Sequence, residues 1–534
     1  MCVLAKGAGV VPELRPWRSA RPHVARLVGA VRPRLARAAA AAGPWVARLT
    51  EAAEPQLTRA TRTWQYTALA ATAGLALAVA AVTAAGPWDS SGQRTAERDR
   101  ATARGSTGGV DHGAGSAGRE PSPAPSAASV LTGLGSGTPG HAVPAAPGGK
   151  AFADVLGPLL KDPSLGPRRS AAVVDISTGK RLYAVAAGTA LTPASTTKIA
   201  TAVAALSALG PDHRLTTRTA LETGTKELVL VGGGDPTLTA RAEADGNASL
   251  RTLADRTAAA LRKRGLRKVT LSYDTTLYAG RALHPIGVND NLAAVTALMA
   301  DEARTNDSVR GPVPRVPDPA ADAARRFGDF LQDHGITTSA PGPSEATGHA
   351  DALAAVSSPP LASLVERMLT NSDNDIAEAL ARHTAVATGK RADLAGAGAA
   401  IRSRLDRLGL PVSGARIKDG SGLDRTGHLT ADLLTALLVT AADPGHPELR
   451  PTLTGLPVAG FTGTLSSRYA DGAAGLVRAK TGTLTGVNTL AGTVVAHDGR
   501  ILAFAFLTTG TKNPGAAQAA LDRAATALAS CGCR

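Results

Sequence analysis

Apolar and polar positions alternate along two short runs after residue 151, AAVVDI and KRLYAVA, and the polar segment between them contains Gly179. Alternation with a period of two is typical of half-buried strands, and a short break with glycine between two such runs predicts a hairpin. From Ser195 the period changes, because apolar residues now recur at helical spacing until the Gly-Pro pair at 210–211 ends the pattern. The sequence therefore predicts a strand hairpin followed by a helix with an apolar face.

Both kinds of pattern recur along the rest of the chain. The run ELVLVGGGDPTL is typical of a strand broken by a glycine turn, and residues 476–510 contain three strand-like runs with HDG as a hairpin turn. Four stretches have the periodicity of amphipathic helices: 249–265, 319–335, 394–409 and 516–529. This order predicts a mixed fold, α/β in the broad sense and α+β in detail, in which helices pack against an antiparallel sheet.

The first 150 residues have a different pattern. Residues 66–86 carry no charge, and about twenty such residues are the length that a helix needs to cross a bilayer. Eleven Lys and Arg against three acids precede this run, and basic flanks stay in the cytoplasm. We expect a basic cytoplasmic leader at 1–66, a transmembrane signal-anchor at 67–86 and a disordered Gly/Ser/Pro-rich linker at 87–150.

This organisation predicts a single-pass protein of the cell membrane whose catalytic part lies outside the cytoplasm. A soluble alanine-rich helix is the alternative interpretation of the apolar run, because alanine is only marginally hydrophobic on insertion scales. Cleavage after the run is also open.

The composition bears on possible partners. The formal net charge is +15, and clustered basic residues are typical of phosphate binding. Much of the excess lies in the leader, however, and aromatic residues make up only 3% of the chain, so we expect no nucleic-acid partner. The three cysteines have no metal-binding spacing, and we expect no metal or cofactor. Cys531 and Cys533 are too close for an easy ordinary disulfide, so we expect a free tail thiol.

Ser195 and Lys198 stand three residues apart at the start of the predicted helix. This offset places both side chains on one face, about one turn apart, so the lysine can act as a base if burial or a nearby cation keeps its amine neutral. A serine here is also a common helix cap, which is the simpler interpretation of the pair alone. A second Ser-x-x-Lys, Ser177 to Lys180, falls in the predicted hairpin turn, where we interpret it as turn chemistry.

Two further stretches favour catalysis. LTNSDNDIAEAL contains the only Ser-x-Asn of the chain, Ser372 and Asn374, at the head of a helical pattern, and RAKTGTLTG contains the only Lys-Thr-Gly, which begins at Lys480 in a strand-like run. Each alone is typical of a polar cap or a turn. In this order, the three motifs match the Ser-x-x-Lys, Ser-Asp-Asn and Lys-Thr-Gly set of penicillin-binding proteins and class A β-lactamases.

With these motifs, and with VGGGDPTL and IKDGSGLDRTGHLT, residues 155–525 resemble the D-alanyl-D-alanine carboxypeptidases/endopeptidases, which are low-molecular-mass, class C penicillin-binding proteins. The resemblance implies a penicillin-binding-protein/serine β-lactamase-like transpeptidase fold, with a five-stranded antiparallel sheet, helices on both faces and a smaller α/β domain inserted between the first two motifs. The 177 residues from Ser195 to Ser372 fit such an insert. The expected domains are a catalytic domain, 151–211 and 356–534, and an inserted domain, 212–355.

The resemblance also implies a reaction. Ser195 attacks the bond between two terminal D-alanines of a peptidoglycan stem peptide, and β-lactam inhibitors acylate the same serine. Lys198, kept neutral partly by the positive charge of Lys480, takes the proton of the serine. Ser372 passes a proton to the leaving amine, and Asn374 holds the acyl side of the substrate.

The implied substrate-binding residues belong to the third motif: Thr481, Gly482 and Thr483. Thr481 and Lys480 receive the terminal carboxylate, while the backbone N–H groups of Thr483 and Ser195 stabilise the oxyanion.

Two alternatives stay open at this level. A β-lactamase-like hydrolase shares the motifs but needs a fast deacylation base, and no Glu-x-x-Leu-Asn loop follows the second motif. A non-catalytic cell-wall scaffold with the same fold is disfavoured by the intact Ser195, Lys198, Ser372 and Lys480. The family pattern DGSGLSR is DGSGLDR in this chain, so Asp424 adds a charge. The insert also looks short for the family.

Overall fold

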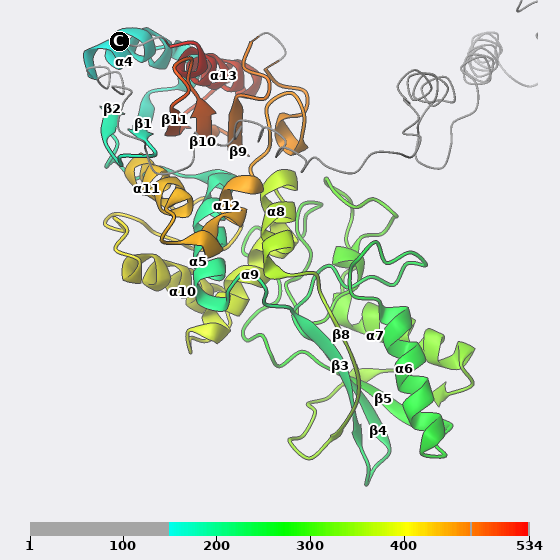
Figure 1. The fold of residues 1–534 in the computed structure, drawn as a ribbon. Helices are drawn as coiled ribbons and strands as arrows, with labels where there is room; N and C mark the ends of the chain where they lie inside the picture. The colour runs from blue at the N-terminus through cyan, green and yellow to red at the C-terminus, as the bar shows by residue number, and fades with distance from the viewer. Residues whose placement is uncertain (1–148, 470–471, 532–534) are drawn as a thin grey trace, which may run out of the picture. The chain divides into compact units, whose positions relative to one another are not determined.

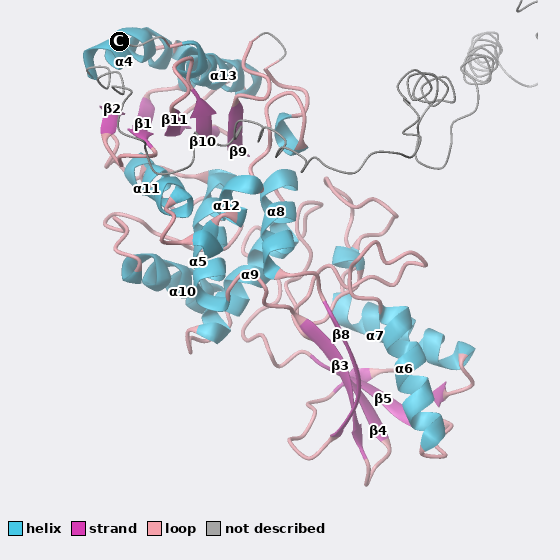
Figure 2. Cartoon of the chain, viewed as in Figure 1, coloured by secondary structure: helices cyan, strands magenta, loops and turns pink. Residues whose placement is uncertain are grey.

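The computed structural model describes residues 149–469 and 472–531 (Figure 1). The predicted leader, transmembrane segment and most of the linker lie outside these residues, so the structure does not test them. Within the described ranges, no helix is both long and apolar enough to cross a membrane. The described chain contains two sheets, each with its own helices (Figure 2).

The larger sheet has five antiparallel strands that come from the two ends of the described chain. In spatial order they are β2 (Arg181–Val185), β1 (Arg168–Asp175), β11 (Ile501–Thr509), β10 (Val487–Val495) and β9 (Val477–Leu484). The predicted hairpin joins β1 to β2, with Gly179 at φ +67° in its turn. The five-stranded antiparallel sheet that the resemblance implied is confirmed.

Helices cover both faces of this sheet (Figure 1). On one face lie α4 (Gly149–Leu160) and α13 (Pro514–Ser530), and on the other lie α5 (Thr197–Leu209) and α11 (Ala431–Ala442). Cys531 follows α13 and is disulfide-bonded, so the expectation of a free tail thiol was wrong.

Strand β11 shows how one sequence serves two cores. Phe504 and Phe506 belong to the core beneath α13, whereas Ala503 and Ala505 belong to the core shared with α5 and α11. Successive side chains of a strand point to opposite faces, and because both faces are covered the run is apolar throughout. The small residues on the second face leave room for the helices that carry the site.

Helix α5 is surrounded by other elements. Every residue of its first ten, Thr197–Leu206, is buried, so the prediction of a single apolar face was too narrow. Its many alanines let neighbours approach on all sides. These neighbours are α8 (Leu361–Asn371), α9 (Asn374–Ala387), α10 (Leu394–Arg407), α11 and α12 (Pro451–Thr454). The described residues also form five short 3₁₀ turns: η1 (Pro163–Leu165), η2 (Ala194–Thr196), η3 (Asp301–Ala303), η4 (Pro447–Leu449) and η5 (Gly463–Leu465).

The second sheet is formed by the chain between α5 and α8. Its strands are β6 (Thr337–Thr338), β5 (Lys268–Asp274), β4 (Glu227–Val231), β3 (Thr216–Glu222) and β8 (Asp351–Ser357), with β7 (Gly342–Pro343) also paired to β5. Pairing is parallel between β4 and β5 and antiparallel on both sides of β3. The accompanying helices are α6 (Leu250–Lys263) and α7 (Pro319–Asp333). Entry and exit strands β3 and β8 pair directly, so this inserted region begins and ends at one place.

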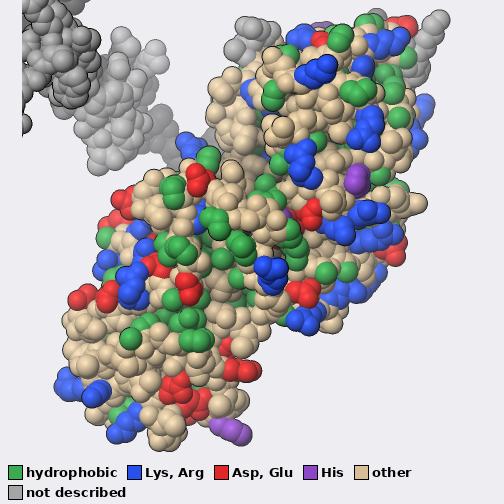
Figure 3. Space-filling view, turned by 180° about the vertical axis from the view of Figure 1, so that it is seen from behind, with side chains coloured by type: hydrophobic (Ala, Val, Ile, Leu, Met, Phe, Trp, Pro, Cys, Tyr) green, Lys and Arg blue, Asp and Glu red, His purple; other side chains and the backbone are tan. Residues whose placement is uncertain are grey.

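Figure 3 shows the charged side chains on one face of the described residues. On the face seen in Figure 3, Lys and Arg side chains of the described residues lie among Asp and Glu side chains over both regions.

Candidate active site

The first motif lies where the 3₁₀ turn η2 leads into α5. Ser195 is in the turn and Lys198 is in the first turn of the helix, and the Nζ atom of Lys198 lies 3.1 Å from the Oγ atom of Ser195. The N-cap position of α5 is held by Thr196, whose side chain makes no capping hydrogen bond. The helix-cap interpretation of Ser195 is therefore wrong, and the serine is available to the lysine.

Two carbonyl oxygens complete the surroundings of the Lys198 amine. Nζ donates to Oδ1 of Asn374 at 2.7 Å and to the backbone oxygen of Ser421 at 2.8 Å. Both oxygens can only accept, so they engage the two N–H bonds of a neutral amine. The lone pair of that amine is then left for the hydroxyl of Ser195. This geometry suits removal of the serine proton.

The orientation of the Asn374 amide is set from the inserted region. Its Nδ2 atom donates to the backbone oxygen of Asn291 at 2.9 Å, and this bond turns Oδ1 towards Lys198. The second motif thus depends on a loop that the sequence analysis did not identify.

Burial tunes the lysine for this role. Lys198 is fully buried, and burial lowers its pKa to about 8, although the charges of Asp419 and Glu378 act in the opposite direction. The neutral amine was predicted to depend partly on Lys480, whereas burial is the largest cause in the structure. Lys480 is also fully buried, and burial together with the charge of Lys198 lowers its own pKa.

The three motifs meet around one pocket of about 270 Å³. Of the predicted residues, those in its lining are Ser195, Ser372, Asn374, Thr481 and Thr483. Ser372 occupies the left-handed turn between α8 and α9 at φ +59°, and the adjoining Asp373 caps α9. Lys480 and Gly482 are not part of the lining. The Lys480 amine instead donates to the backbone oxygen of Thr481 at 2.9 Å.

Gly482 has a packing role. A Cβ atom there would lie 2.1 Å from Oγ1 of Thr489 and 2.7 Å from the backbone oxygen of Pro193. Glycine therefore lets β9 approach the turn that carries Ser195. Gly422 does the same from the DGSG segment, since its Cβ would lie 1.9 Å from the oxygen of Ala194.

Arginines of the inserted region also line the pocket, namely Arg304, Arg310 and Arg315. Arg315 contacts Asp375 at 2.8 Å, directly beside the second motif, and Arg304 contacts Glu302 at 2.8 Å. Burial raises the pKa of both carboxyl groups. These arginines were not predicted, because their loop has no periodic pattern and no motif.

Asp424, which replaces the serine of the family pattern, forms a local turn. Its Oδ1 atom accepts from the backbone N–H of Thr426 at 2.8 Å and from the Thr426 hydroxyl at 2.7 Å. The carboxylate therefore stabilises the loop after Gly422 and does not enter the pocket lining.

Two buried groups of side chains in the described ranges have the donor atoms of a cation site: His284, Glu378 and Asp419, and Glu302, Asp373 and Asp375. Three arginines contact the second group, Arg304, Arg315 and Arg367, so its negative charge is already compensated. The first group adjoins the Lys198 site, since the charges of Asp419 and Glu378 act on the Lys198 amine.

The fold and the pocket together define a serine acyl-transfer enzyme of the penicillin-binding class, with a lysine in the place of the base. Comparison with known proteins agrees. The family model of D-Ala-D-Ala carboxypeptidase 3 (S13) matches residues 153–310 and 306–528. This chain belongs to that family, and the predicted family is confirmed.

Individual relatives support the same assignment. The chain is 35% identical to a carboxypeptidase of Mycobacterium tuberculosis over 432 residues, which are 78% of this chain and 91% of that protein. It is 36% identical to carboxypeptidase DacB of Mycolicibacterium smegmatis over 403 residues, 72% of this chain and 85% of that protein. Penicillin binding protein 4 of Haemophilus influenzae has the same fold, with a TM-score of 0.57 at 23% identity over 70% of this chain and 97% of that one.

Proposed function

We propose that this chain is a serine-type D-Ala-D-Ala carboxypeptidase that acts on peptidoglycan stem peptides and is acylated by β-lactams at Ser195. The observation that carries the proposal is the Lys198 amine, which is buried, bound by two acceptors and 3.1 Å from the Ser195 hydroxyl. The family membership supplies the substrate class.

The reaction begins with attack of Ser195 Oγ on the carbonyl carbon of the penultimate D-alanine, while Lys198 takes the hydroxyl proton. The backbone N–H groups of Ser195 and Thr483 stabilise the oxyanion. Collapse of this intermediate breaks the C–N bond, and Ser372 passes a proton to the departing amine of D-alanine. Water then hydrolyses the ester and regenerates the serine. In a β-lactam the broken amide stays attached to the acyl group, which keeps the leaving amine near the ester.

Direct contact with the terminal carboxylate falls to the hydroxyl groups of β9. Thr481 and Thr483 line the pocket, and Thr481 lies 3.1 Å from the hydroxyl of Thr464. Lys480 lies beneath them with its amine on the Thr481 carbonyl. We therefore assign the hydroxyls to binding and Lys480 to support of the strand and of the local charge.

A second activity, endopeptidase cleavage of cross-linked peptides, is favoured by the extent of the pocket. Arg304, Arg310 and Asn371 line both the pocket of Ser195 and an adjoining cavity of about 480 Å³ in the inserted region. An endopeptidase needs this kind of room for a second peptide. Release of monomers from purified cross-linked dimers, compared with release of D-alanine from pentapeptides, measures the preference.

We also propose a site of action, which the sequence supports. The uncharged run at 67–86 and the basic residues before it support a single-pass anchor, with the catalytic part on the outer side of the cell membrane. Protease added to intact spheroplasts should degrade the catalytic part and leave a short membrane-bound fragment. Full protection of the catalytic part would contradict this topology.

Fluorescent penicillin tests the nucleophile in the full-length chain. We expect stable label on the peptide that carries Ser195, found by mass spectrometry, together with release of D-alanine from a stem pentapeptide. Ser195→Ala should abolish both, while the matched control Ser177→Ala retains both. Rapid loss of the label with hydrolysed drug would favour the β-lactamase alternative. A folded protein with neither label nor D-alanine release would favour the scaffold.

A further inference from the structure

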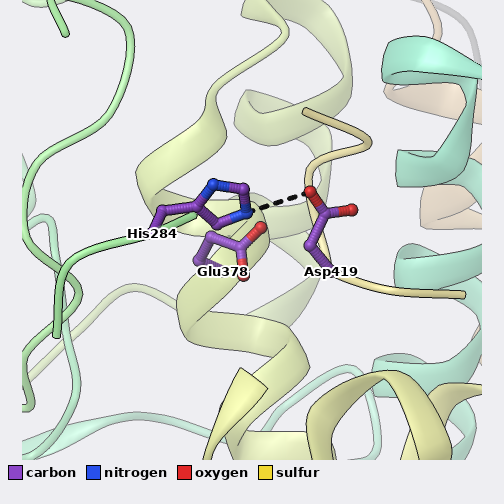
Figure 4. A group of neighbouring side chains, drawn as sticks. All are labelled: His284, Glu378 and Asp419. Atoms are coloured by element: carbon purple, nitrogen blue, oxygen red, sulfur yellow. Dashed lines mark hydrogen bonds and ion pairs between the residues drawn. The ribbon is translucent and has the colours of Figure 1, made fainter. Parts of the chain in front are cut away.

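His284 joins the inserted region to the site of Lys198. It lies in the loop after β5, and its Nε2 atom is 3.1 Å from Oδ2 of Asp419 in the DGSG segment. Each of the two side chains is only 2% exposed. Figure 4 shows the imidazole ring directed at Asp419, with Glu378 of α9 beside the ring. His284 belongs to no recognisable sequence motif, so its role was not predicted.

Asp419 holds the backbone that follows it. Its Oδ1 atom accepts from the N–H of Gly422 at 2.9 Å, and its Oδ2 atom accepts from the N–H of Asp424 at 2.7 Å. From the other side, Oε1 of Glu378 accepts from the N–H of Ser421 at 2.9 Å. Between these bonds the carbonyl of Ser421 points at Lys198, 2.8 Å from its amine.

We propose that His284 is a positioning residue for the Lys198 base, contributed by the inserted region. It anchors Asp419, Asp419 fixes the Ser421 carbonyl, and that carbonyl orients the lysine amine towards Ser195. The inference rests on the proposed acyl transfer at Ser195. It gives the inserted region a part in the chemistry, besides its part in the pocket wall.

The charge of His284 also affects the protonation of Lys198. The carboxylates of Asp419 and Glu378 favour the protonated, inactive form of Lys198, and an imidazolium on His284 opposes them. Burial disfavours this imidazolium, but the hydrogen bond with Asp419 and the nearby carboxylates outweigh it, so the pKa of His284 is raised. The charged groups around the ring are Asp419, Asp424, Glu378, and, through the adjoining cavity, Arg281, Arg382 and Asp393. Loss of the histidine charge should therefore make Lys198 harder to deprotonate.

The same three side chains have atoms that suit a cation, since one donor of each lies within 4.8 Å of the others. Glu378 is fully buried, and its Oε2 atom has no hydrogen-bond partner among the residues that the structure describes. Both oxygens of Asp419, however, already accept backbone N–H bonds. The geometry therefore favours a hydrogen-bonded anchor over a metal site.

The test is the second-order rate constant of acylation by fluorescent penicillin, measured on the full-length chain from pH 5 to 10. The variants are His284→Ala, which removes the anchor, and His284→Gln, which keeps a donor for Asp419 but cannot be charged. The matched control is His334→Gln, because His334 pairs with Asp255 at 2.5 Å on the exposed surface of the same inserted region.

For His284→Ala we expect a loss of about tenfold to hundredfold at the alkaline plateau, the scale of a misplaced catalytic group. The midpoint of the acidic limb should also rise by about 0.5 to 1 pH unit, since a removed charge no longer opposes protonation of Lys198. His284→Gln should recover most of the plateau but keep the raised midpoint. His334→Gln should match the wild type in both.

Three outcomes overturn the proposal. One is a His284→Ala variant that matches the control at every pH. Another is an equal loss in both His284 variants with an unmoved acidic limb, which indicates a merely structural role. The third is a wild-type rate that falls on treatment with EDTA and returns with Zn²⁺, which assigns the cluster to a metal. Absence of labelling in the wild type would instead contradict the proposed function.

Discussion

The chain contains the same Ser-x-x-Lys spacing twice, and the two copies differ in what surrounds the lysine. Ser177 donates to Oδ1 of Asp175 at 2.6 Å within the β1–β2 turn, and Lys180 is exposed to solvent. Lys198 is fully buried and lies 3.1 Å from Ser195. A motif of four residues therefore has two physical meanings, and burial decides between them.

The burial of Lys198 comes from distant parts of the chain. Asn374 begins α9, Ser421 lies in a loop before α11, and Gly482 brings β9 against the turn of Ser195. Among the described residues, no comparable elements cover the β1–β2 turn, where a Cβ atom on Gly179 would meet nothing within 4 Å. The base exists because elements remote in sequence exclude water from one lysine and not from the other.

Exchange of each lysine for methionine gives the largest expected contrast. Lys198→Met should lower the rate of acylation by about a thousandfold or more, because a general base typically contributes 10²–10⁴-fold. Lys180→Met should stay within about twofold, since the side chain is exposed and far from the motifs in the fold. Stopped-flow labelling with a chromogenic β-lactam measures both. Equal effects would remove the distinction between the two copies.

The pH dependence of stability gives the next contrast. The folded-state pKa of Lys198 is about 8, against an ordinary value of 10.5. Between these values the unfolded chain binds the proton and the folded chain does not, so the free energy of unfolding rises with pH from about 8 to 10.5. Relative to Lys198→Met, the wild type should gain up to about 3 kcal/mol over this window.

Urea unfolding of the wild type and Lys198→Met at pH 7.5 and 10.5 measures this contribution of Lys198 to the free energy of unfolding. The contributions of the other titratable groups cancel when the free energy of one protein is subtracted from that of the other. The same comparison with Lys180→Met should show little change with pH. A flat difference for Lys198→Met would contradict the buried, neutral amine.

Two glycines provide the smallest contrast. Gly482→Ala should cost about 1–3 kcal/mol of stability, the range for overpacking, and lower acylation as β9 moves from the turn of Ser195. Gly179→Ala should cost only about 1 kcal/mol, through its φ of +67°, and leave acylation unchanged. Thermal unfolding and the labelling rate measure these effects. A tolerated alanine at Gly482 would show that the strand and the turn are less tightly coupled.

Much of the fold followed from local pattern. The hairpin around Gly179, the helix after Ser195 and the helices within 249–265 and 319–335 are all observed. The five-stranded sheet and its helices followed from the family resemblance. The apolar face predicted for α5 was too narrow, because periodicity does not reveal a helix whose own small residues allow other helices to enclose it on every side.

The site was predicted unevenly. Motif residues such as Ser195 and Asn374 were found, since short spacings on one helix or strand are visible in sequence. Their partners Asn291, Ser421 and His284 act through single backbone or ring atoms supplied by loops. Any residue type can offer a backbone carbonyl, and so no pattern marks these positions.

The sequence by itself determined the elements and the reactive groups: a serine and a lysine one helical turn apart, a Ser-Asp-Asn before a helix and a Lys-Thr-Gly in a strand. Only the tertiary structure decided that Lys198 is shielded from solvent and that two acceptors bind its N–H groups. It also decided that His284 of the inserted region holds, through Asp419, the segment that carries one of these acceptors. The physical reason is the distance along the chain over which each effect acts. Propensity and spacing act over a few residues, whereas desolvation and hydrogen-bond closure depend on every segment that packs around the amine.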